Sequence, residues 1–568
     1  MSLSFIDFEV FKHDWLVVIM RPDTQEEVVI INDKDKLNEY YQTHKDDIYV
    51  GYNIRGYDQF IFKAILCGLN PKDVNDYIIR DGGNGYNYST LFRNINLNIF
   101  DAKTNQAYGL KQLEGFMGED IEETSVPFDI DRKLTAKELS DVVHYCKHDV
   151  AETMMVFMHR YEEFTSQLEM VKTFNLPISD MSKSKAQLSA KILNANRKSH
   201  NDEFDFVIPK NKISKYKKVV EWYQDDNNKD YDKQLEIDIA GVPHIFAWGG
   251  LHGARPNYRS KGYFINVDVA SYYPSMMIEC GYSSRNIADA KKFEEIYHTR
   301  LKYKAEKNPK QAPLKIVLNS TYGAMKDKYN PLYDPLMANN VCVTGQLWLL
   351  DLIEHLEPYC DIIQSNTDGI LVKLRANNDK EADEQYQIVD DICFEWEQRT
   401  GMNLEFDEFV EVIQKDVNNY IIIDKDGKYK SKGAYVKKLD VLDYDLPIVN
   451  KALINYFING VSVDKTINDC DDLIEFQKIV KLSGKYDYVM YGDEVLQNKC
   501  FRVFASNAFG NKGIYKVKEG KNPEKFANTP ENCFIDNSNI QNKKCPRTLN
   551  KQWYIDLANT RLQQFLGE

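Results

Sequence analysis

The stretch Asp268-Val-Ala-Ser-Tyr-Tyr-Pro-Ser275 directly follows an apolar run, residues 262–267, that is typical of a β-strand. The run ends on a carboxylate, and two aromatic rings and a proline come just after it. An acid in this position either points into a cleft or simply terminates the strand. The stretch alone leaves both interpretations open, so the rest of the chain has to decide between them.

A second stretch, Lys315-Ile-Val-Leu-Asn-Ser-Thr-Tyr-Gly323, lies in a helix that we expect over residues 313–325. Lys315, Asn319 and Tyr322 are spaced i, i+4 and i+7, so the helix places them on one face. A cation, an amide and a flat ring along one stripe suit a triphosphate, a base edge and a base plane. This spacing therefore favours a nucleotide-binding face.

The preceding helix, expected over residues 286–306, adds two further cations. Arg300 and Lys304 are spaced i and i+4 and so share a face. They either point at the same phosphates or form an ordinary solvated basic surface. Together the two helices form a helical hairpin between two carboxylate-bearing strands.

The third stretch, Ser365-Asn-Thr-Asp-Gly369, is the centre of a predicted strand, turn and strand over residues 361–373. Phosphoryl transfer needs two divalent ions, which are held by carboxylates that converge from separate strands. Asp268 at a strand end and Asp368 at a hairpin tip can supply them. A plain hairpin turn would explain Asp368 alone, but the order of the three stretches favours a phosphoryl-transfer site.

These stretches resemble motifs A, B and C of family B DNA polymerases, written D-x-x-S-L-Y-P, K-x-x-x-N-S-x-Y-G and D-T-D. The resemblance implies that Asp268 and Asp368 are catalytic metal ligands and that Val269 offers its backbone carbonyl to a metal. It also implies two Mg²⁺ ions, or Mn²⁺ ions, in each active site.

The same resemblance implies the substrate contacts. Lys315 would bind the triphosphate of an incoming dNTP, and Arg300 and Lys304 would face it. Asn319 and Tyr322 would border the nascent base pair, while Tyr273 would exclude a ribose 2′-hydroxyl. These are the substrate-binding residues that we expect.

A further resemblance concerns the primer strand. The strand at 420–429 and the following Lys430-Ser-Lys-Gly433 are similar to the primer-gripping K-K-x-Y region of the family and the Lys-Gly that follows it. The two lysines that precede the tyrosine in K-K-x-Y are absent before Tyr420. We therefore expect Lys415 or Lys432 to grip the primer, with Lys432 as the main candidate.

A second set of acids lies near the start of the chain. Asp7 and Glu9 alternate on one predicted strand, Asp58 ends the stretch Gly51-Tyr-Asn-Ile-Arg-Gly-Tyr-Asp58, and Asp149 follows Tyr145 by one helical turn. Four carboxylates can bind two metals that activate water against a phosphodiester. The set therefore predicts a nuclease site.

This set resembles the Exo I, Exo II and Exo III motifs (D-x-E, N-x-x-x-[FY]-D and Y-x-x-x-D) of DEDDy 3′–5′ exonucleases that precede family B polymerase domains. The resemblance implies that Asn53 binds a single-stranded 3′ end and that Tyr145 orients the attacking water. Tyr57 and Phe60 either stack on frayed bases or pack in the core. Lys111 is a candidate phosphate contact.

The chain departs from the family pattern at three places. Asn366 stands where motif C usually has its first acid, and Gly369 stands where serine is usual. Glu405 is a candidate compensating acid, although a surface glutamate explains it better. The K-K-x-Y lysines are missing, as described above. Finally, Phe246-Ala-Trp-Gly-Gly250 only approximates the Y-x-G-G linker. We expect these changes to affect the reaction rate, metal affinity and primer handling, while Asp268 and Asp368 still carry catalysis.

With 568 residues, the chain is too long for one core, and strand-like and helical runs alternate over residues 1–70. We expect an α/β and α+β multidomain protein, with an RNase H-like exonuclease domain followed by a right-hand polymerase. The expected domains are an exonuclease (1–190), a palm with its linker (191–285 and 326–440), fingers (286–325) and a thumb (441–568). The polar stretch 210–233 is expected to be a surface excursion.

The spacing of the motifs is informative as well. Lys315 follows Asp268 by only 47 positions, and Asp368 follows Tyr322 by 46. This leaves no room for the two long insertions of protein-primed phage polymerases, so a nucleic-acid primer is expected. We expect a compact phage-type or mobile-element replicase whose partners are primer–template DNA, dNTPs and replisome proteins.

Composition sets limits on this hypothesis. The net charge of −14 repels phosphate, so a DNA channel must be a local concentration of lysine and arginine. The ten cysteines show no C-x-x-C spacing, and no apolar run approaches the length of a membrane span. We expect a cytoplasmic protein without a membrane partner.

Two alternatives to a proofreading polymerase stay open. One is a 3′–5′ exonuclease with a decayed polymerase half, and the other is a noncatalytic primer–template binding protein.

Overall fold

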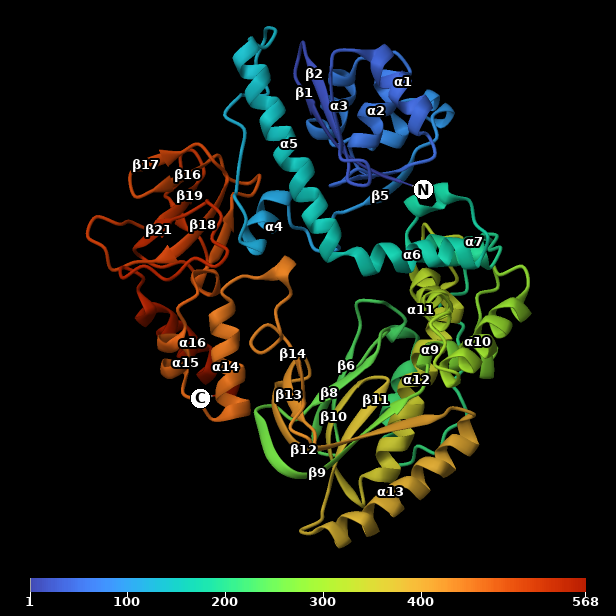
Figure 1. The fold of residues 1–568 in the computed structure, drawn as a ribbon. Helices are drawn as coiled ribbons and strands as arrows, with labels where there is room; N and C mark the ends of the chain where they lie inside the picture. The colour runs from blue at the N-terminus through green and yellow to red at the C-terminus, as the bar shows by residue number, and fades with distance from the viewer. Residues whose placement is uncertain (1, 568) are drawn as a thin grey trace. The chain divides into compact units, whose positions relative to one another are not determined.

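The computed structural model describes residues 2–567 and is a mixed α/β multidomain protein with several sheets (Figure 1). The chain forms two compact units. The first unit comprises Met1–Ser182, Leu439–Ala452 and Ser462–Leu557, and the second comprises Lys183–Lys438, Leu453–Val461 and Ala558–Glu568. Most of the segment expected to be a thumb therefore clusters with the amino-terminal segment. The four domain boundaries expected from the sequence stay a prediction.

The amino-terminal part of the first unit is built on a five-stranded sheet in the order β3-β2-β1-β4-β5. β1 pairs antiparallel with β2 and parallel with β4, so the sheet is mixed. Its strands are β1 (Leu3–Val10), β2 (Trp15–Arg21), β3 (Glu26–Ile31), β4 (Ile48–Gly51) and β5 (Asn98–Asp101). Its helices are α1 (Lys34–His44), α2 (Asp58–Leu66), α3 (Pro71–Ile79), α4 (Leu110–Met117), α5 (Ala136–His159) and α6 (Tyr161–Thr173).

α5 carries part of the candidate nuclease site, and its limits follow from local chemistry. It begins with a capping box in which Thr135 and Glu138 cap each other's backbone amides. The sequence predicts one helix over 136–163, whereas the structure has two helices that meet at Arg160. The guanidinium of Arg160 donates to the carbonyl oxygens of Asp101 and Lys103, at 3.2 and 2.6 Å, which holds the chain at the break.

The carboxy-terminal part of the first unit contains two small sheets, in the orders β15-β18-β21 and β17-β16-β19-β20. The sequence predicts helices over 446–459 and 551–565 here, but neither a helix over 463–469 nor these short strands. The strands are β15 (Lys478–Lys481), β16 (Tyr488–Tyr491), β17 (Glu494–Leu496), β18 (Cys500–Ala505), β19 (Ile514–Val517), β20 (Glu524–Lys525) and β21 (Cys533–Ile535). The helices are α14 (Pro447–Asn459), α15 (Val463–Asp469) and α16 (Lys551–Leu566), of which α14 and α16 span the division between units.

The second unit is built on a nine-stranded sheet in the order β14-β13-β12-β9-β11-β10-β8-β7-β6. β9 is central and pairs antiparallel with β11 on one side and β12 on the other. The strands are β6 (Leu235–Ile239), β7 (Val242–Phe246), β8 (Leu251–Ala254), β9 (Tyr258–Val269), β10 (Cys360–Thr367), β11 (Gly369–Leu374), β12 (Leu404–Asp416), β13 (Asn419–Ile423) and β14 (Tyr429–Lys432).

Helices α12 and α13 pack against this sheet, and α10 and α11 form the predicted hairpin. The helices of this unit are α7 (Lys185–Ile192), α8 (Lys217–Gln224), α9 (Tyr272–Glu279), α10 (Ala290–Ala305), α11 (Gln311–Lys326), α12 (Pro335–Leu356) and α13 (Asp379–Thr400). Among residues 2–567, only α12 is long and apolar enough to cross a membrane by length and composition. As in the core helix of a globular domain, 94% of its apolar window is buried inside the structure.

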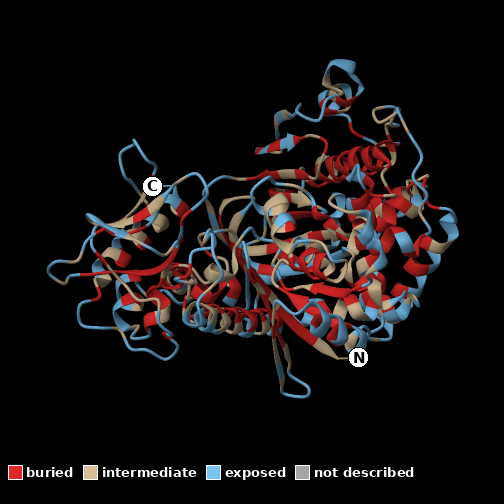
Figure 2. Ribbon diagram, turned by 90° about the horizontal axis from the view of Figure 1, so that it is seen from above, coloured by how far each residue is buried: buried red, intermediate tan, exposed pale blue. Residues whose placement is uncertain are grey.

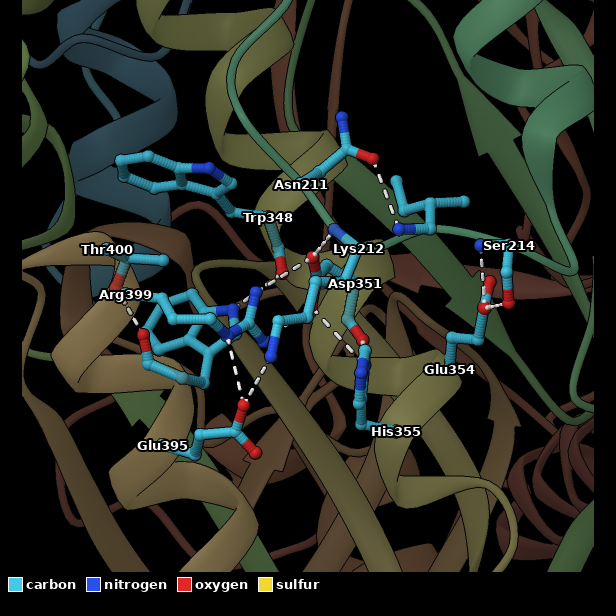
Figure 3. A network of polar contacts seen from close by, with 12 residues as sticks. Asn211, Lys212, Ser214, Trp348, Asp351, Glu354, His355, Glu395, Arg399 and Thr400 are labelled. Carbon is cyan, nitrogen blue, oxygen red and sulfur yellow. Dashed lines mark hydrogen bonds and ion pairs between the residues drawn. The ribbon is translucent and has the colours of Figure 1, made fainter.

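The expectation that residues 210–233 form a surface excursion is wrong in part. This stretch contains α8, whose Val219 and Tyr223 are buried because they lie one helical turn apart on the inner face. The segment before α8 is anchored to α12, where buried Asp351 accepts a hydrogen bond from the backbone amide of Lys212 at 2.5 Å (Figure 3). Arg399 of α13 binds the same carboxylate, at 2.8 Å, and thereby joins the two helices below the sheet.

Figure 2 shows that buried residues gather inside the packed sheets and helices, and exposed residues on the outer helices and loops.

Candidate active sites

A cleft of about 600 Å³ in the second unit brings the predicted polymerase residues together. Its walls come from the end of β9, the start of α9, the helices α10 and α11, the β10–β11 hairpin and the start of β12. It is lined by Asp268, Val269, Ala270, Ser271, Tyr272, Tyr273, Pro274, Arg300, Lys304, Gln311, Lys315, Asn319, Asp368 and Glu405. Segments about a hundred positions apart in the sequence therefore meet in one polar hollow.

The two predicted metal-binding carboxylates are held side by side by the sheet. Asp268 lies opposite Gly369 of β11, and the amide of Val269 donates to the carbonyl oxygen of Asp368 at 2.8 Å. Burial, followed by the charge of Asp368, raises the pKa of Asp268 to about 6. Burial also raises the pKa of Asp368. Two acids that repel each other in a polar cleft are suited to hold divalent cations, which prefer oxygen ligands.

Neighbouring residues fix the orientation of Asp268. The side-chain amide of Asn266 donates to Asp268 Oδ2 at 2.6 Å. On the other side, Gly369 leaves room for the carboxylate, because a Cβ atom at this position would lie 1.8 Å from Asp268 Oδ1. The departure from serine at position 369 is therefore a packing requirement of this particular site.

Asn366 faces a second cavity of about 230 Å³ rather than the main cleft. It pairs with Gly369 across the hairpin, and both Asp268 and Asp368 border the same cavity. The residues lining this cavity are Asn266, Asp268, Gln364, Asn366, Asp368, Gly369, Leu371, Tyr420, Ile422 and Lys430. The neutral amide of Asn366 therefore shares this second cavity with the polar side chains of Asn266, Gln364 and Lys430.

The stripe on α11 divides between the cleft and the core. Lys315 and Asn319 line the cleft, whereas Tyr322 is buried and stacks on Tyr273, with ring centroids 3.9 Å apart and an interplanar angle of 13°. Lys326 lies over the Tyr322 ring, at 4.9 Å from its centroid. Tyr322 thus supports Tyr273, which itself lines the cleft.

Arg300 and Lys304 both line the cleft but differ in their surroundings. Arg300 is only 7% exposed, so a solvated basic surface does not describe it. It donates to the hydroxyl of Ser271 at 2.5 Å, and its Nε atom is buried without a hydrogen-bond partner among residues 2–567. Lys304 is half exposed and forms an ion pair with Glu405 at 2.8 Å.

The sequence left open whether Glu405 belongs to the active site or to the protein surface. It lies directly opposite Asp268 on β12, so the alternation of strand side chains puts both acids on the same sheet face. The strand-like pattern of residues 404–416 was the only sequence signal for the position of Glu405. That signal becomes informative only once the pairing of β12 with β9 is known. The cleft therefore has a third carboxylate, which is neutralised by Lys304.

The two lysines expected to grip the primer lie on different strands, Lys415 on β12 and Lys432 on β14. Lys432 is exposed and pairs across the strands with Tyr420, which lines the second cavity. Lys430 lines the same cavity and forms an ion pair with Asp407 at 2.8 Å. Lys415 lies over the ring of Tyr435, at 4.6 Å from its centroid. Of these three lysines, only Lys430 lines a cavity that Asp268 and Asp368 also border, so the expected concentration of lysines along the primer stays a prediction.

In the first unit, the four predicted nuclease acids converge from β1, α2 and α5. Asp58 accepts a hydrogen bond from the amide of Phe8, which lies between Asp7 and Glu9, at 3.3 Å. Burial and the charges of the neighbouring acids raise the pKa of Asp7 and Glu9 well above their ordinary values. Burial raises the pKa of Asp58 to about 7.

The fourth acid, Asp149, is neutralised by a lysine. Lys111 forms ion pairs with Asp149 and Glu114, and its ammonium lies 4.7 Å from the centre of the Tyr145 ring. Burial raises the pKa of Asp149 to about 6, while the charge of Lys111 opposes that shift. Lys111 was expected as a phosphate contact, and it lies inside the nuclease site. Tyr145 lies beside Asp149, as expected from their spacing.

The structure adds one residue that the sequence missed and decides an alternative that the sequence left open. The Cys146 thiol lies 3.4 Å from Asp7 Oδ2, next to Glu9, and sequence spacing gave no signal for it. Phe60 is 1% exposed and packs against Gly85, so it is a core residue and not a stacking platform. Asn53 is held by Lys103, whose ammonium donates to its side-chain oxygen at 3.2 Å.

Comparison with family models finds no match, and comparison with curated proteins finds none either. Among solved structures, this chain is similar to the family B DNA polymerase from the hyperthermophilic archaeon Pyrobaculum calidifontis. The similarity has a TM-score of 0.44 and 15% sequence identity, and it covers 100% of this chain and 78% of that chain. A TM-score below 0.5 does not establish a shared fold, so the function has to be inferred from the sites themselves.

Proposed function

We propose that this protein is a template-directed DNA polymerase with a 3′–5′ proofreading exonuclease. The cleft in the second unit is the observation that carries the proposal. It combines two adjacent carboxylates, Asp268 and Asp368, with the cations of Arg300, Lys304 and Lys315. Acids suit divalent metals and cations suit a triphosphate, so the cleft has the two charge types that nucleotidyl transfer requires.

The donor set fits two Mg²⁺ or Mn²⁺ ions. Asp268 and Asp368 offer carboxylate oxygens, and Val269, whose backbone carbonyl would be a further ligand, lines the same cleft. When bound, such ions lower the pKa of the attacking hydroxyl and neutralise charge on the phosphates. Asn366 supplies no charge, so Asp268 and Asp368 carry the binding, with Glu405 as the third acid nearby.

The other residues of the cleft position the substrate. Lys315 and Arg300 bind the triphosphate, and Asn319 lies one helical turn further along α11, where the base pair would form. The ring of Tyr273, held flat against Tyr322, closes the space below the sugar. This arrangement supports selection of a deoxyribose over a ribose.

The acids of the first unit support the proofreading part of the proposal. Asp7, Glu9, Asp58 and Asp149 offer oxygen ligands for two further ions. Burial raises the pKa values of all four acids, and the charges of neighbouring nuclease acids add to the shift for Asp7 and Glu9, which supports a site that takes up cations. The phenol of Tyr145 beside Asp149 is placed to orient a water molecule. A frayed, single-stranded 3′ end is the substrate.

We further propose a nucleic-acid primer and a role in the replication of phage or mobile-element DNA. The short spacing between the three polymerase stretches supports this, because it leaves no room for long insertions. We also propose a cytoplasmic location, which is supported by ten cysteines that show no C-x-x-C spacing.

One primer-extension experiment tests the proposal against its alternatives. Wild type, Asp268→Ala and Asp7→Ala are compared with Mg²⁺ on matched and mismatched primers, with and without dNTPs. We expect Asp268→Ala to lose extension but keep degradation, and Asp7→Ala to extend mismatched primers without trimming them. Degradation without any extension by the wild type would favour a decayed polymerase half. DNA binding with neither activity would favour a noncatalytic binding protein.

A further inference from the structure

A cavity of about 310 Å³ in the second unit has no part in either proposed reaction. It lies between α13 and the strands β9 and β12, and none of its lining residues borders the polymerase cleft or the second cavity. Phe264, Ile265 and Phe409 form its buried apolar part. Binding sites for small ligands span about 300–1,000 Å³, so this cavity suits one large side chain better than a whole nucleotide.

A β-bulge opens the sheet beside this cavity. The pairing of β9 with β12 shifts its register after Phe409, so that Gly262 and Tyr263 both lie opposite Val410. In a regular strand successive side chains point to opposite faces, whereas a bulge redirects them. Tyr263 and Val410 both border the cavity, and Val410 is 40% exposed. The bulge therefore leaves an apolar wall of the sheet open to solvent.

Helix α13 supplies the facing wall. The residues of α13 that border the cavity are spaced i, i+3, i+4 and i+7, so they share one helix face: Asp379, Ala382, Asp383 and Tyr386. The hydroxyl of Tyr263 donates to the carboxylate of Asp379 at 2.7 Å, which ties the helix to β9. The cavity therefore has an aromatic ring on each wall, Tyr386 on the helix and Tyr263 on the sheet.

Negative charge surrounds the mouth of this cavity. Asp379, Asp383 and Glu408 are exposed and border it, against the single positive charge of Lys425. In the part of the chain that the structure describes, none of the three acids forms an ion pair with a lysine or an arginine. The helix dipole explains the acid at position 379, in the first turn of α13, but not Asp383 or Glu408. An apolar cavity bordered by unpaired acids suits an apolar group with positive charge beside it.

We propose that a partner protein docks in this cavity through a segment in which basic residues flank an aromatic one. The aromatic side chain enters between Tyr263 and Tyr386, where ring contacts add to the area that is buried. The basic side chains pair with Asp383 and Glu408. DNA is a poor occupant because the acids repel phosphate, and a second copy of this chain is disfavoured by the net charge of −14. Docking here is independent of the polymerase reaction, because none of these residues lines an active site.

Fluorescence anisotropy of a labelled peptide tests this docking on the full chain. The peptide carries one tryptophan flanked by two arginines on each side, and excess Mg²⁺ occupies the acids of the two active sites. We expect saturable binding to the wild type. A peptide with serine in place of tryptophan should bind at least about tenfold more weakly, because a buried aromatic anchor carries much of the binding energy.

Asp383→Asn combined with Glu408→Gln should weaken binding of the tryptophan peptide by at least about fivefold, because it removes two of the charges that face the arginines. Glu384→Gln combined with Asp391→Asn is the matched control, since both acids are exposed on α13 and neither borders the cavity. The control should bind the peptide as the wild type does. Equal binding by the two double variants would indicate general attraction to an acidic protein and would overturn the proposal, as would no binding by the wild type.

Val410→Ser tests the apolar wall separately from the acids. It should weaken binding of the tryptophan peptide but not of the serine peptide, because it removes apolar surface from the cavity. All five substituted positions are exposed, so the thermal midpoints should stay close to that of the wild type. Displacement of the peptide by a single-stranded oligonucleotide would assign the cavity to nucleic acid and overturn the proposal. Self-association of the wild type that the Asp383 and Glu408 double variant abolishes would assign it to a second copy, with the same consequence.

Discussion

Gly369 of β11 lies directly opposite Asp268 of β9, and a Cβ atom on the glycine would lie 1.8 Å from Asp268 Oδ1. The same glycine immediately follows Asp368 in the hairpin. One missing side chain therefore lets both acids face the same cleft. The sheet register, and not only the identity of the acids, sets the geometry of the site.

Gly369→Ala should strongly impair DNA synthesis, because the added methyl group has to displace the carboxylate of Asp268. A shift of about 1 Å at a reacting group can reduce the rate by about 100-fold. Single-turnover extension with saturating dNTP measures this effect. The control is Gly427→Ala, where nothing lies within 4 Å of a new Cβ, although the positive φ of 77° costs some local stability. Wild-type extension by Gly369→Ala would contradict the geometry.

Tyr273→Ala should increase incorporation of ribonucleotides. Its ring lines the cleft and is held by the stacked ring of Tyr322, so its removal opens space below the sugar. Tyr322→Leu should have the same effect in weaker form, because it removes the support but leaves the ring. The ratio of rNTP to dNTP incorporation measures this selectivity. An unchanged ratio in Tyr273→Ala would rule out a role in sugar selection.

Arg300→Lys should raise the KM for dNTPs by about tenfold with a smaller effect on kcat. Arg300 is buried beside the cleft and has an Nε atom free to donate, and a lysine cannot reproduce its planar set of donors. Lys302→Met is the comparison, because Lys302 is exposed on the same helix and does not line the cleft. Steady-state kinetics on a primed template distinguish them. Equal effects of the two changes would argue against a special role of Arg300.

How well the sequence predicts a site residue depends on whether its signal lies in a short motif or in contacts between distant segments of the chain. Asp268, Asp368, Lys315 and Asn319 were predicted because each lies in a short motif with its own local pattern. The structure gathers all four around one cleft. The hairpin of α10 and α11 was predicted from helical periodicity and the intervening Lys-Asn-Pro-Lys stretch.

Other features depend on contacts between distant segments, which no local pattern reveals. Glu405 is relevant only through its register with Asp268, and Glu114 only through the packing of α4 on α5. The sequence predicted that Tyr322 borders the substrate, because it shares a helix face with Lys315 and Asn319. It gave no signal that the Tyr322 ring stacks on Tyr273. The two small sheets after residue 478 were missed because their strands are only two to six residues long.

The metal-free protein should lose stability as the pH rises from about 4 to about 7. The pKa values of Asp58 and Glu152 are raised to about 7 and those of Asp149 and Asp268 to about 6. In this window the folded state keeps protons that the unfolded chain, with pKa values near 4, has released. The free energy of unfolding therefore falls as the pH rises through this window.

Thermal midpoints at several pH values, with a chelator and with Mg²⁺, measure this dependence. Divalent ions should stabilise the protein much more at pH 8 than at pH 5, because they replace the lost protons. Asp58→Asn should flatten the dependence of the metal-free protein. A midpoint that rises steadily from pH 5 to pH 8 in chelator would contradict the raised pKa values.

Arg502→Met should destabilise the first unit by about 3 kcal/mol or more. Arg502 is fully buried, and its guanidinium donates to the carbonyl oxygens of Glu119 and Ser538, at 2.7 and 2.6 Å, and to Gln477 at 3.1 Å. Methionine fills a similar volume but leaves these acceptors buried and unpaired, which is among the costly single changes in proteins. Urea unfolding followed by fluorescence measures the loss, and Arg547→Met, at an exposed position, is the control.

Because β18, which carries Arg502, packs on α4, the same change should also loosen Lys111 from the nuclease acids and reduce 3′–5′ degradation more than extension. A variant with normal stability and normal trimming of mismatched primers would show that this hydrogen-bonded hub does not support the nuclease site.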